Sequence, residues 1–205
     1  MVKNVLLTGF EPFGGEKINP SWEVVKNVKE RKIEGATIEA VQLPCVYNLA
    51  VKEAIKKIRE SEPCVVISLG QAGGRPDISI ERVALNVQDA TIADNAGNKR
   101  TEERINQDSV DAYFSTLPLT EIVDVLRDNN IPVRISNSAG TYVCNDLMYG
   151  VLEYIKREEL RTLAGFIHVP YLPEQAVKHP GTASMSLDLM EQALELIIKI
   201  ALKYI

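Results

Sequence analysis

The sequence predicts a single-domain α/β fold, a three-layer α/β/α sandwich built on a mostly parallel, twisted sheet. Short apolar runs alternate with amphipathic helical patterns along the chain, which is the order of elements that produces parallel sheets. The 205 residues, 45% hydrophobic and 25% charged, suit one domain with a full core. We therefore treat residues 1–205 as one domain.

The first elements are expected in the order strand, helix, strand, helix. Residues 5–8 form a short apolar run closed by Gly9, which is typical of a buried strand. Asn19 followed by Pro20 predicts a helix cap and a first helical turn, so a helix should run to about residue 30. A second strand and an amphipathic helix are expected at 36–43 and 48–59.

The middle of the chain adds two expected strands and a long loop. Residues 64–69 form a continuous apolar strand ended by Gly70, and residues 78–87 alternate partly and predict one strand that carries Glu81. Residues 88–112 are polar and irregular. A loop of this length favours a lid or a subunit contact over a simple connection.

The last third predicts a helix, a strand, a helix, a strand and a long final helix. Their expected ranges are 119–128, 133–136, 144–157, 164–169 and 184–204, with Ser184 as the final cap. Apolar residues are so dense at 194–201 that more than one helix face should be covered, by a neighbouring helix or another subunit.

Charge and cysteine content exclude several classes of function. With 23 basic and 28 acidic side chains the net charge is −5, and no basic block indicates nucleic acid or anionic membrane as a partner. The first apolar run is too short for a signal peptide or a membrane span, so we expect a cytoplasmic protein. Cys45, Cys64 and Cys144 have no metal-binding spacing, and we expect free thiols without a bound metal.

Cys144 is a candidate nucleophile because an apolar strand and small residues precede it and a helical pattern begins just after it. Ala139 and Gly140 allow a sharp turn. The free N–H groups and positive dipole end of a helix start favour thiolate over thiol. The alternative is a buried cysteine that serves as a small apolar side chain.

A base for Cys144 must be one of only two histidines, His168 or His179. His168 is preferred because it lies near the end of an expected strand, which holds an imidazole more rigidly than a Pro-Gly loop does. Glu81 is either a solvent-facing carboxylate or a partner of His168. Phe10 and Phe13 lie in a glycine-rich segment, 9–15, and form either a ligand wall or a loop packed under the domain edge.

Four runs of the sequence resemble the pyroglutamyl peptidase I family. They are GFEPFGG at 9–15, the segment 70–86 that contains ISIERVA, ISNSAGTYVCN at 135–145, and GFIHVPYLPE at 165–174. The resemblance covers nearly the whole chain. It implies a cysteine exopeptidase that removes N-terminal pyroglutamate, with an α/β sandwich fold and a homotetrameric assembly.

The resemblance also implies roles for individual residues. Cys144 would be the nucleophile, His168 its general base and acid, and Glu81 the residue that orients the imidazole, with no metal or cofactor. Phe10 and Phe13 would enclose the pyrrolidone ring. The remaining residues implied for the substrate pocket are Asn19, Gln71, Ile92, Tyr142 and Val143.

One segment departs from the family pattern. Members commonly read Asp-Ala-Arg-Ile-Pro-Asp-Asn where this chain has Thr91 in place of the arginine and Ala93 in place of the proline. If that arginine contributes to the oxyanion site, Thr91 removes its share. Two alternatives therefore stay open: a hydrolase of another small amide, and a non-catalytic binding protein on the same fold.

Overall fold

The main sheet of the computed structural model, which describes residues 3–205, has six strands in the order β2-β1-β3-β8-β4-β7. Neighbouring strands pair in parallel, except that β4 and β8 are antiparallel. The strands are β1 (Asn4–Phe10), β2 (Thr37–Leu43), β3 (Val65–Gln71), β4 (Ile78–Glu81), β7 (Val133–Ser136) and β8 (Leu163–Val169). The expected α/β class and mostly parallel sheet are confirmed.

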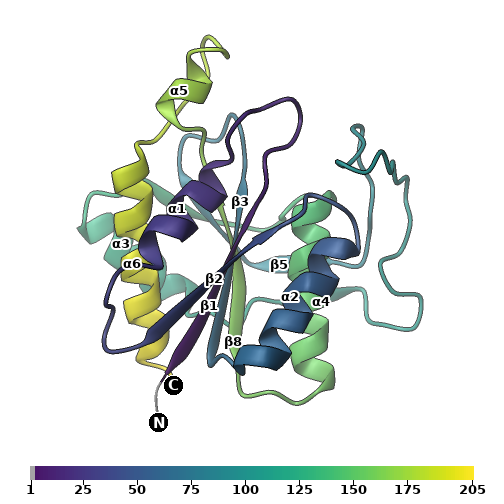
Figure 1. The fold of residues 1–205 in the computed structure, drawn as a ribbon, viewed down its shortest axis with the longest axis horizontal. Coiled ribbons are helices and arrows are strands. Elements are labelled where there is room, and N and C mark those ends of the chain that lie inside the picture. Colours follow the sequence, from purple (N-terminus) through teal and green to yellow (C-terminus); the bar gives the residue numbers. More distant parts are fainter. Residues whose placement is uncertain (1–2) are drawn as a thin grey trace.

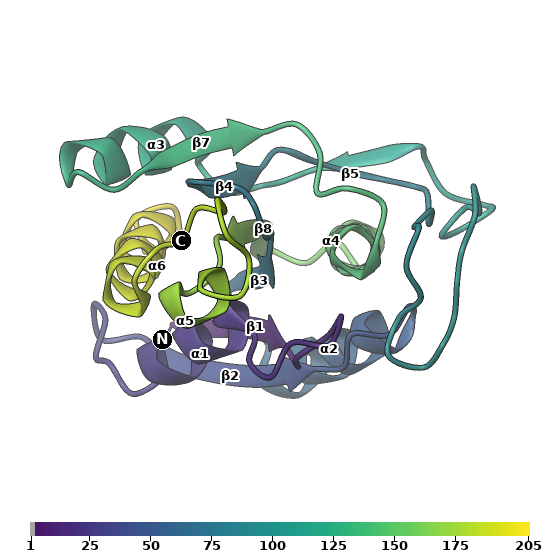
Figure 2. The ribbon, with the colours of Figure 1, turned by 90° about the horizontal axis from the view of Figure 1, so that it is seen from above.

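Helices cover both faces of this sheet (Figure 1, Figure 2). One face carries α1 (Pro20–Val28), α3 (Leu119–Asp128) and α6 (Leu187–Leu202), whose apolar side chains share one buried cluster with the sheet. The other face carries α2 (Leu49–Ser61) and α4 (Val143–Arg157), which share a second cluster. The three-layer sandwich predicted from the sequence is therefore confirmed, with one apolar core on each side of the sheet.

The expected strand at 78–87 is in fact two strands in different sheets. After β4 the chain leaves the main sheet at Arg82, whose N–H donates to the Ser136 carbonyl. It continues as β5 (Val83–Leu85), which pairs with β6 (Ala112–Phe114) in a separate two-stranded sheet. All four residues of β4 are buried, because a strand inside the main sheet is covered on both faces. The single-strand prediction was wrong.

Of the two helix caps predicted with a named residue, Asn19 and Ser184, one is confirmed and one is wrong. Asn19 caps α1 as expected, since its side-chain oxygen accepts the Ser21 N–H at 3.1 Å. The final helix is preceded by Ser186, whereas the predicted cap Ser184 forms a bridge with Tyr171. The dense apolar stretch of α6 packs on α1 and α3, so neighbouring helices of the same chain cover its faces.

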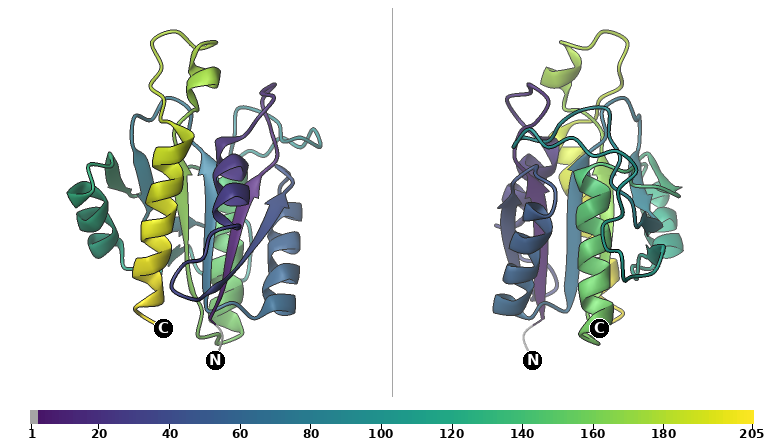
Figure 3. Two further views of the ribbon diagram at one scale, coloured as in Figure 1. Left: turned by 60° about the vertical axis from the view of Figure 1, so that its left-hand side comes forward. Right: turned by 90° about the vertical axis from the view of Figure 1, so that its right-hand side faces the viewer.

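Two segments lie outside this regular arrangement. The short helix α5 (Pro173–Ala176), which the sequence did not predict, projects beyond the carboxyl end of β8 (Figure 3). The segment 86–111 is largely irregular, as expected. Among residues 3–205, every helix is too short or too polar to cross a membrane.

Candidate active site

Glu81 and His168 form a buried pair on the face of the sheet that α4 covers. His168 Nδ1 lies 2.8 Å from Glu81 Oε1, and the Glu81 side chain is 0% exposed. Glu81 is opposite Phe166 in the β4–β8 pairing, and residues two apart on a strand share a face, so Phe166 and His168 both point toward Glu81's side. The solvent-facing alternative for Glu81 is therefore wrong.

Cys144 lies beside this pair, at the start of α4. It is the second residue of the helix, after Tyr142 in the cap position and Val143. A Cβ added to Gly70 would lie 2.8 Å from Cys144 Sγ, and Gly70 is opposite His168 in the β3–β8 pairing. The sulfur thus lies next to the strand pair that carries the imidazole, as the sequence predicted.

The route by which the chain brings these residues together differs from the expectation. The sequence predicted a crevice at the shared carboxyl ends of parallel strands. β4 is antiparallel to β8 and parallel to β7, so β4 and β7 both run in the opposite direction to β8. Their carboxyl ends therefore do not lie at the same edge of the sheet as that of β8. The turn 137–142, with Gly140 at φ +79°, then brings the start of α4 to the site. A positive φ of this kind favours glycine.

The pKa of the Cys144 thiol is governed mainly by its burial. Burial raises its pKa well above the usual range, and nearby Cys45 and Glu81 raise it further. Arg75 and the backbone N–H of Cys144 act in the opposite direction but do not outweigh burial. Burial therefore opposes the preference for thiolate that a helix start predicts. A base must take the proton as the sulfur attacks.

The carboxyl of Glu81 remains ionised although it is buried. Burial opposes its ionisation, but hydrogen bonding to His168, the His168 charge, the nearby Ser136 hydroxyl and the contact with Arg75 together lower its pKa below the ordinary value. Arg75 Nη1 lies 2.7 Å from Glu81 Oε1. An ionised carboxylate that accepts from Nδ1 holds the imidazole in the tautomer with Nε2 free to accept a proton.

The predicted apolar pocket is only partly assembled around this centre. Phe13 and Tyr142 lie near each other, with ring centroids 6.0 Å apart. Phe10 is the last residue of β1 and is buried in the core beside Phe166. Val143 is fully buried beneath the helix start, whereas Ile92 is 50% exposed. Ile92 and Tyr142 line a surface hollow of about 420 Å³ together with Thr91.

Gln71 and Asn19 lie where they support the adjoining loops. Gln71 ends β3, and its side-chain oxygen accepts a hydrogen bond from the buried Gln175 at 2.9 Å. The Asn19 amide donates to the Glu11 carbonyl at 3.0 Å, in addition to its cap role. The Asn19 side chain is thus occupied within the protein, and the Gln71 side chain is anchored through its oxygen.

Contacts that the sequence did not predict tie the pocket loops together. Glu11 Oε1 accepts from the Cys45 N–H at 3.1 Å and from Asn95 Nδ2 at 2.8 Å. The Tyr142 hydroxyl donates to the Ala93 carbonyl at 3.1 Å, so the loop with the departures at Thr91 and Ala93 is fastened to the turn before Cys144. Glu11 lies between Phe10 and Phe13 in the first glycine-rich segment, and this location is the sequence feature that could have indicated its role.

Other features of the surface do not coincide with the predicted site. A groove of about 690 Å³ runs between α2 and α4, and its lining contains none of the predicted site residues. Within residues 3–205, no group of three or more His, Cys, Asp or Glu side chains is arranged to hold a metal ion.

Comparison with known proteins agrees with this geometry. The profile of the family described as pyroglutamyl peptidase matches residues 3–204. The chain is 54% identical to pyrrolidone-carboxylate peptidase 2 of Caldanaerobacter subterraneus subsp. tengcongensis, over 97% of this chain and 96% of the relative. It is 50% identical to the pyrrolidone-carboxylate peptidase of Yersinia pestis, strain Pestoides F, over 98% and 94%.

Solved structures show the same similarity. Pyroglutamyl peptidase I of Bacillus amyloliquefaciens superimposes with a TM-score of 0.94 at 42% identity, covering 97% of this chain and 96% of that one. A mutant pyrrolidone carboxyl peptidase of the hyperthermophile Pyrococcus furiosus gives a TM-score of 0.95 at 42% identity, covering 98% and 99%. The chain therefore belongs to the pyroglutamyl peptidase family.

Proposed function

We propose that this chain is a cysteine exopeptidase that releases N-terminal pyroglutamate from peptides, with residues 1–205 acting as one catalytic domain. Cys144 is the nucleophile, His168 the general base and acid, and Glu81 the residue that orients His168. The observation that carries this assignment is the buried Glu81–His168 hydrogen bond of 2.8 Å beside a cysteine at a helix start. Family membership supports the substrate class.

The reaction begins with a neutral thiol. His168 Nε2 takes the proton of Cys144 as the sulfur attacks the carbonyl carbon of the pyroglutamyl residue, and the ionised Glu81 stabilises the imidazolium that forms. The imidazolium then gives this proton to the leaving amine, and a thioester remains on Cys144. Water, deprotonated by His168, hydrolyses the thioester and releases pyroglutamate.

The first turn of α4 supplies donors for the tetrahedral intermediate. The leading N–H groups of a helix have no partner within it, and Cys144 is its second residue. Each donor aimed at a developing oxyanion is typically worth about 3–4 kcal/mol. With Thr91 in place of the common arginine, backbone donors of this turn carry the oxyanion in our proposal.

The pocket residues bind the lactam ring rather than a charged group. Phe10, Phe13, Ile92, Tyr142 and Val143 provide apolar surface, and the Gln71 backbone pairs with the lactam amide. Asn19 holds the segment that carries both phenylalanines. A small uncharged ring calls for apolar walls with few polar contacts.

Hydrolysis of pyroglutamyl aminomethylcoumarin by the wild type and by Cys144→Ala tests the proposal. The wild type should release the fluorophore, and Cys144→Ala should not. Cys64→Ala is the matched control, because its thiol lies before β3 and contacts the Asn4 carbonyl away from the site. Full activity of Cys144→Ala, or a wild type that cleaves prolyl and acetyl-amino-acid amides but not the pyroglutamyl amide, would contradict it.

We also propose that the protein is a cytoplasmic homotetramer. Exposed apolar side chains such as Phe114, Val177 and Tyr204 support a subunit interface, and three free cysteines suit a reducing compartment. Light scattering on the eluting protein should give four times the 22.8 kDa chain mass, and a monomer at micromolar concentration would contradict the assembly. Cell fractionation tests the location.

A further inference from the structure

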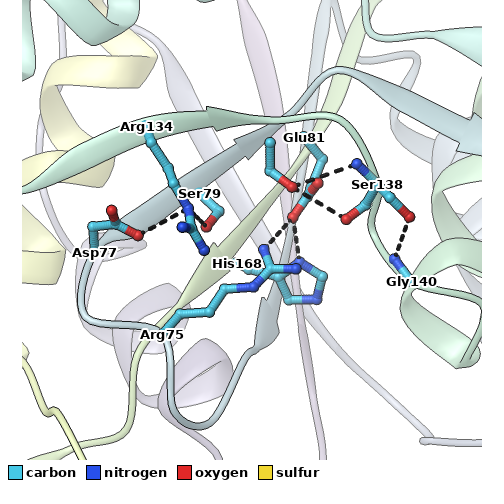
Figure 4. Close-up of polar contacts among 9 residues, drawn as sticks. Arg75, Asp77, Ser79, Glu81, Arg134, Ser138, Gly140 and His168 are labelled. Carbon is cyan, nitrogen blue, oxygen red and sulfur yellow. Dashed lines mark hydrogen bonds and ion pairs between the residues drawn. The ribbon is translucent and has the colours of Figure 1, made fainter.

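Arg75 contacts the same oxygen of Glu81 that His168 uses. Arg75 Nη1 lies 2.7 Å from Glu81 Oε1, and His168 Nδ1 lies 2.8 Å from that atom (Figure 4). Glu81 is 0% exposed, whereas Arg75 is 27% exposed. Within residues 3–205, the other carboxylate oxygen, Oε2, is buried without a hydrogen-bond partner. The carboxylate is therefore held through one oxygen by two donors.

The other arginines near β4 make different contacts. Arg82 directs its Nε to the Asn137 side chain at 2.9 Å. Arg134 pairs with Asp77 at 3.1 Å and contacts Ser79 Oγ at 3.4 Å (Figure 4). Arg75 is thus the arginine that reaches Glu81, and a buried carboxylate needs such a partner because desolvation of an unpaired charge is costly.

The backbone around Arg75 fixes the direction of its side chain. Arg75 directly follows Gly74, whose φ is +87°, and its N–H donates to the Ala72 carbonyl at 3.2 Å. An added Cβ on Gly73 would lie 2.3 Å from the Tyr171 ring, so this turn packs closely on the segment after β8. The turn begins right after Gln71, and it connects the proposed lactam contact to the proposed catalytic pair.

We propose that Arg75 is a positioning residue of the active site, which fixes the Glu81 carboxylate against His168 and keeps it ionised through the catalytic cycle. The inference rests on the proposed function of Cys144, His168 and Glu81 and assigns a further part to it. The guanidinium meets the carboxylate from the solvent side, while the imidazole meets it from within the sheet.

The charge of Arg75 acts on both titrating partners in the site. At Glu81, burial raises the pKa, and the hydrogen bond to His168 is the largest of the effects that lower it. Arg75 also lowers the pKa of Glu81. It also counteracts burial at Cys144, whose pKa is raised. Without the guanidinium, both pKa values rise. Glu81 then gains a proton at higher pH, and the Cys144 thiolate forms at higher pH.

Three variants test this role: Arg75→Gln, Arg75→Lys and the matched control Arg134→Gln. Steady-state hydrolysis of pyroglutamyl aminomethylcoumarin across pH gives kcat and KM. Peptide-resolved mass spectrometry of iodoacetamide labelling gives the alkylation rate of Cys144 across pH, separately from Cys45 and Cys64. Circular dichroism melting shows that each variant is folded.

Arg75→Gln should lower kcat by about 10–100-fold, the usual effect of losing a partner that orients a reactive side chain, with KM close to the wild type. The acid limb of the kcat/KM profile and the pH profile of alkylation should both shift to higher pH by about one unit. This is the lower end of the shift that an adjacent charge causes, because Arg75 is partly exposed to solvent. Arg75→Lys should restore the profiles more fully than kcat, since it keeps the charge but not the planar fork.

A folded Arg75→Gln protein with wild-type kcat and unshifted profiles would overturn the proposal. If Arg75→Gln does not fold, Arg75→Lys decides: a wild-type kcat would overturn the positioning role. Arg134→Gln should shift neither profile, and an equal shift there would also overturn the specific role of Arg75. If the wild type fails to cleave the pyroglutamyl amide, the proposed function fails, whereas the alkylation profile still reports on Arg75.

Discussion

A methyl group added at Gly70 should disable the site at small cost to the fold. In Gly70→Ala, the new Cβ would lie 2.8 Å from Cys144 Sγ and 2.8 Å from Phe166 Cζ. Atoms of this size normally approach to about 3.5–4.0 Å, so the sulfur must retreat by about 1 Å or the Phe166 ring must move. Phe166 is fully buried beside His168, which leaves the sulfur and the imidazole to absorb the change.

The size of the effect follows from how strongly catalysis depends on position. A misplacement of about 1 Å costs roughly 100-fold in rate, whereas an extra methyl group in a packed core costs about 1–3 kcal/mol of stability. Gly70→Ala should therefore lose about 100-fold in kcat/KM for the pyroglutamyl amide. Urea unfolding should show that it remains folded at the assay temperature.

Gly165→Ala is the matched control on the neighbouring strand. Its Cβ would meet Leu117 Cδ1 and Ser115 Oγ, both at 2.5 Å, away from the sulfur. It should lose a similar amount of stability but retain kcat/KM once folded. A Gly70→Ala protein with wild-type kcat/KM would refute the reasoning, and so would equal activity losses in the two variants.

The loops around the site support three more predictions. Asn95→Ala removes hydrogen bonds to Glu11 Oε1 and the Pro12 carbonyl. Because such a hydrogen bond contributes about 0.5–1.5 kcal/mol, KM should rise by up to about tenfold with little change in kcat. An unchanged KM would contradict a role of these hydrogen bonds in shaping the pocket. Asn19→Ala removes a helix cap and should lower the urea unfolding free energy by about 1 kcal/mol; an unchanged urea midpoint would contradict the cap role. At Asp94, burial opposes ionisation, but hydrogen bonds from Asn98, Tyr47 and Ala96 lower the pKa below its ordinary value. The ionised carboxylate therefore stabilises the folded protein fully above the unfolded-state pKa of about 3.9, and this stabilisation is lost as pH falls through the lower pKa of the folded state. Asp94→Asn should thus be less stable than the wild type at pH 7, with a gap that narrows below about pH 4 in urea titrations, and a constant gap would exclude the carboxylate charge as its cause.

Local sequence signals predicted most elements because their causes are local. The Asn19-Pro20 pair marks the start of α1 through a side-chain cap, and the match at 119–128 reflects the spacing of apolar residues on one helix face. The errors lie where tertiary pairing overrides local pattern. Residues 78–87 read as one strand, but the main sheet accommodates only Ile78–Glu81 before the chain turns away to pair with β6.

The candidate site residues could likewise be predicted in part from the sequence. A helix-start cysteine, a strand-borne histidine and a strand-borne glutamate can be recognised from the sequence, and the resemblance to a family supplied the role of Glu81 and most of the pocket. Arg75 was missed because a lone arginine in a glycine-rich loop gives no sign of its partner. Its contact with Glu81 depends on the turn after β3, which local periodicity does not describe.

The sequence by itself determined the α/β order, the Asn19 cap and the chemical identity of the proposed nucleophile and base, because these depend on neighbours along the chain. Only the tertiary structure decided that β4 runs against β8, that the buried Glu81 has partners that lower its pKa, and that burial raises the pKa of Cys144. The physical reason is that strand direction, desolvation and charge pairing arise between segments far apart in the chain. A pKa is set by what packs around a group, and folding alone brings those neighbours together.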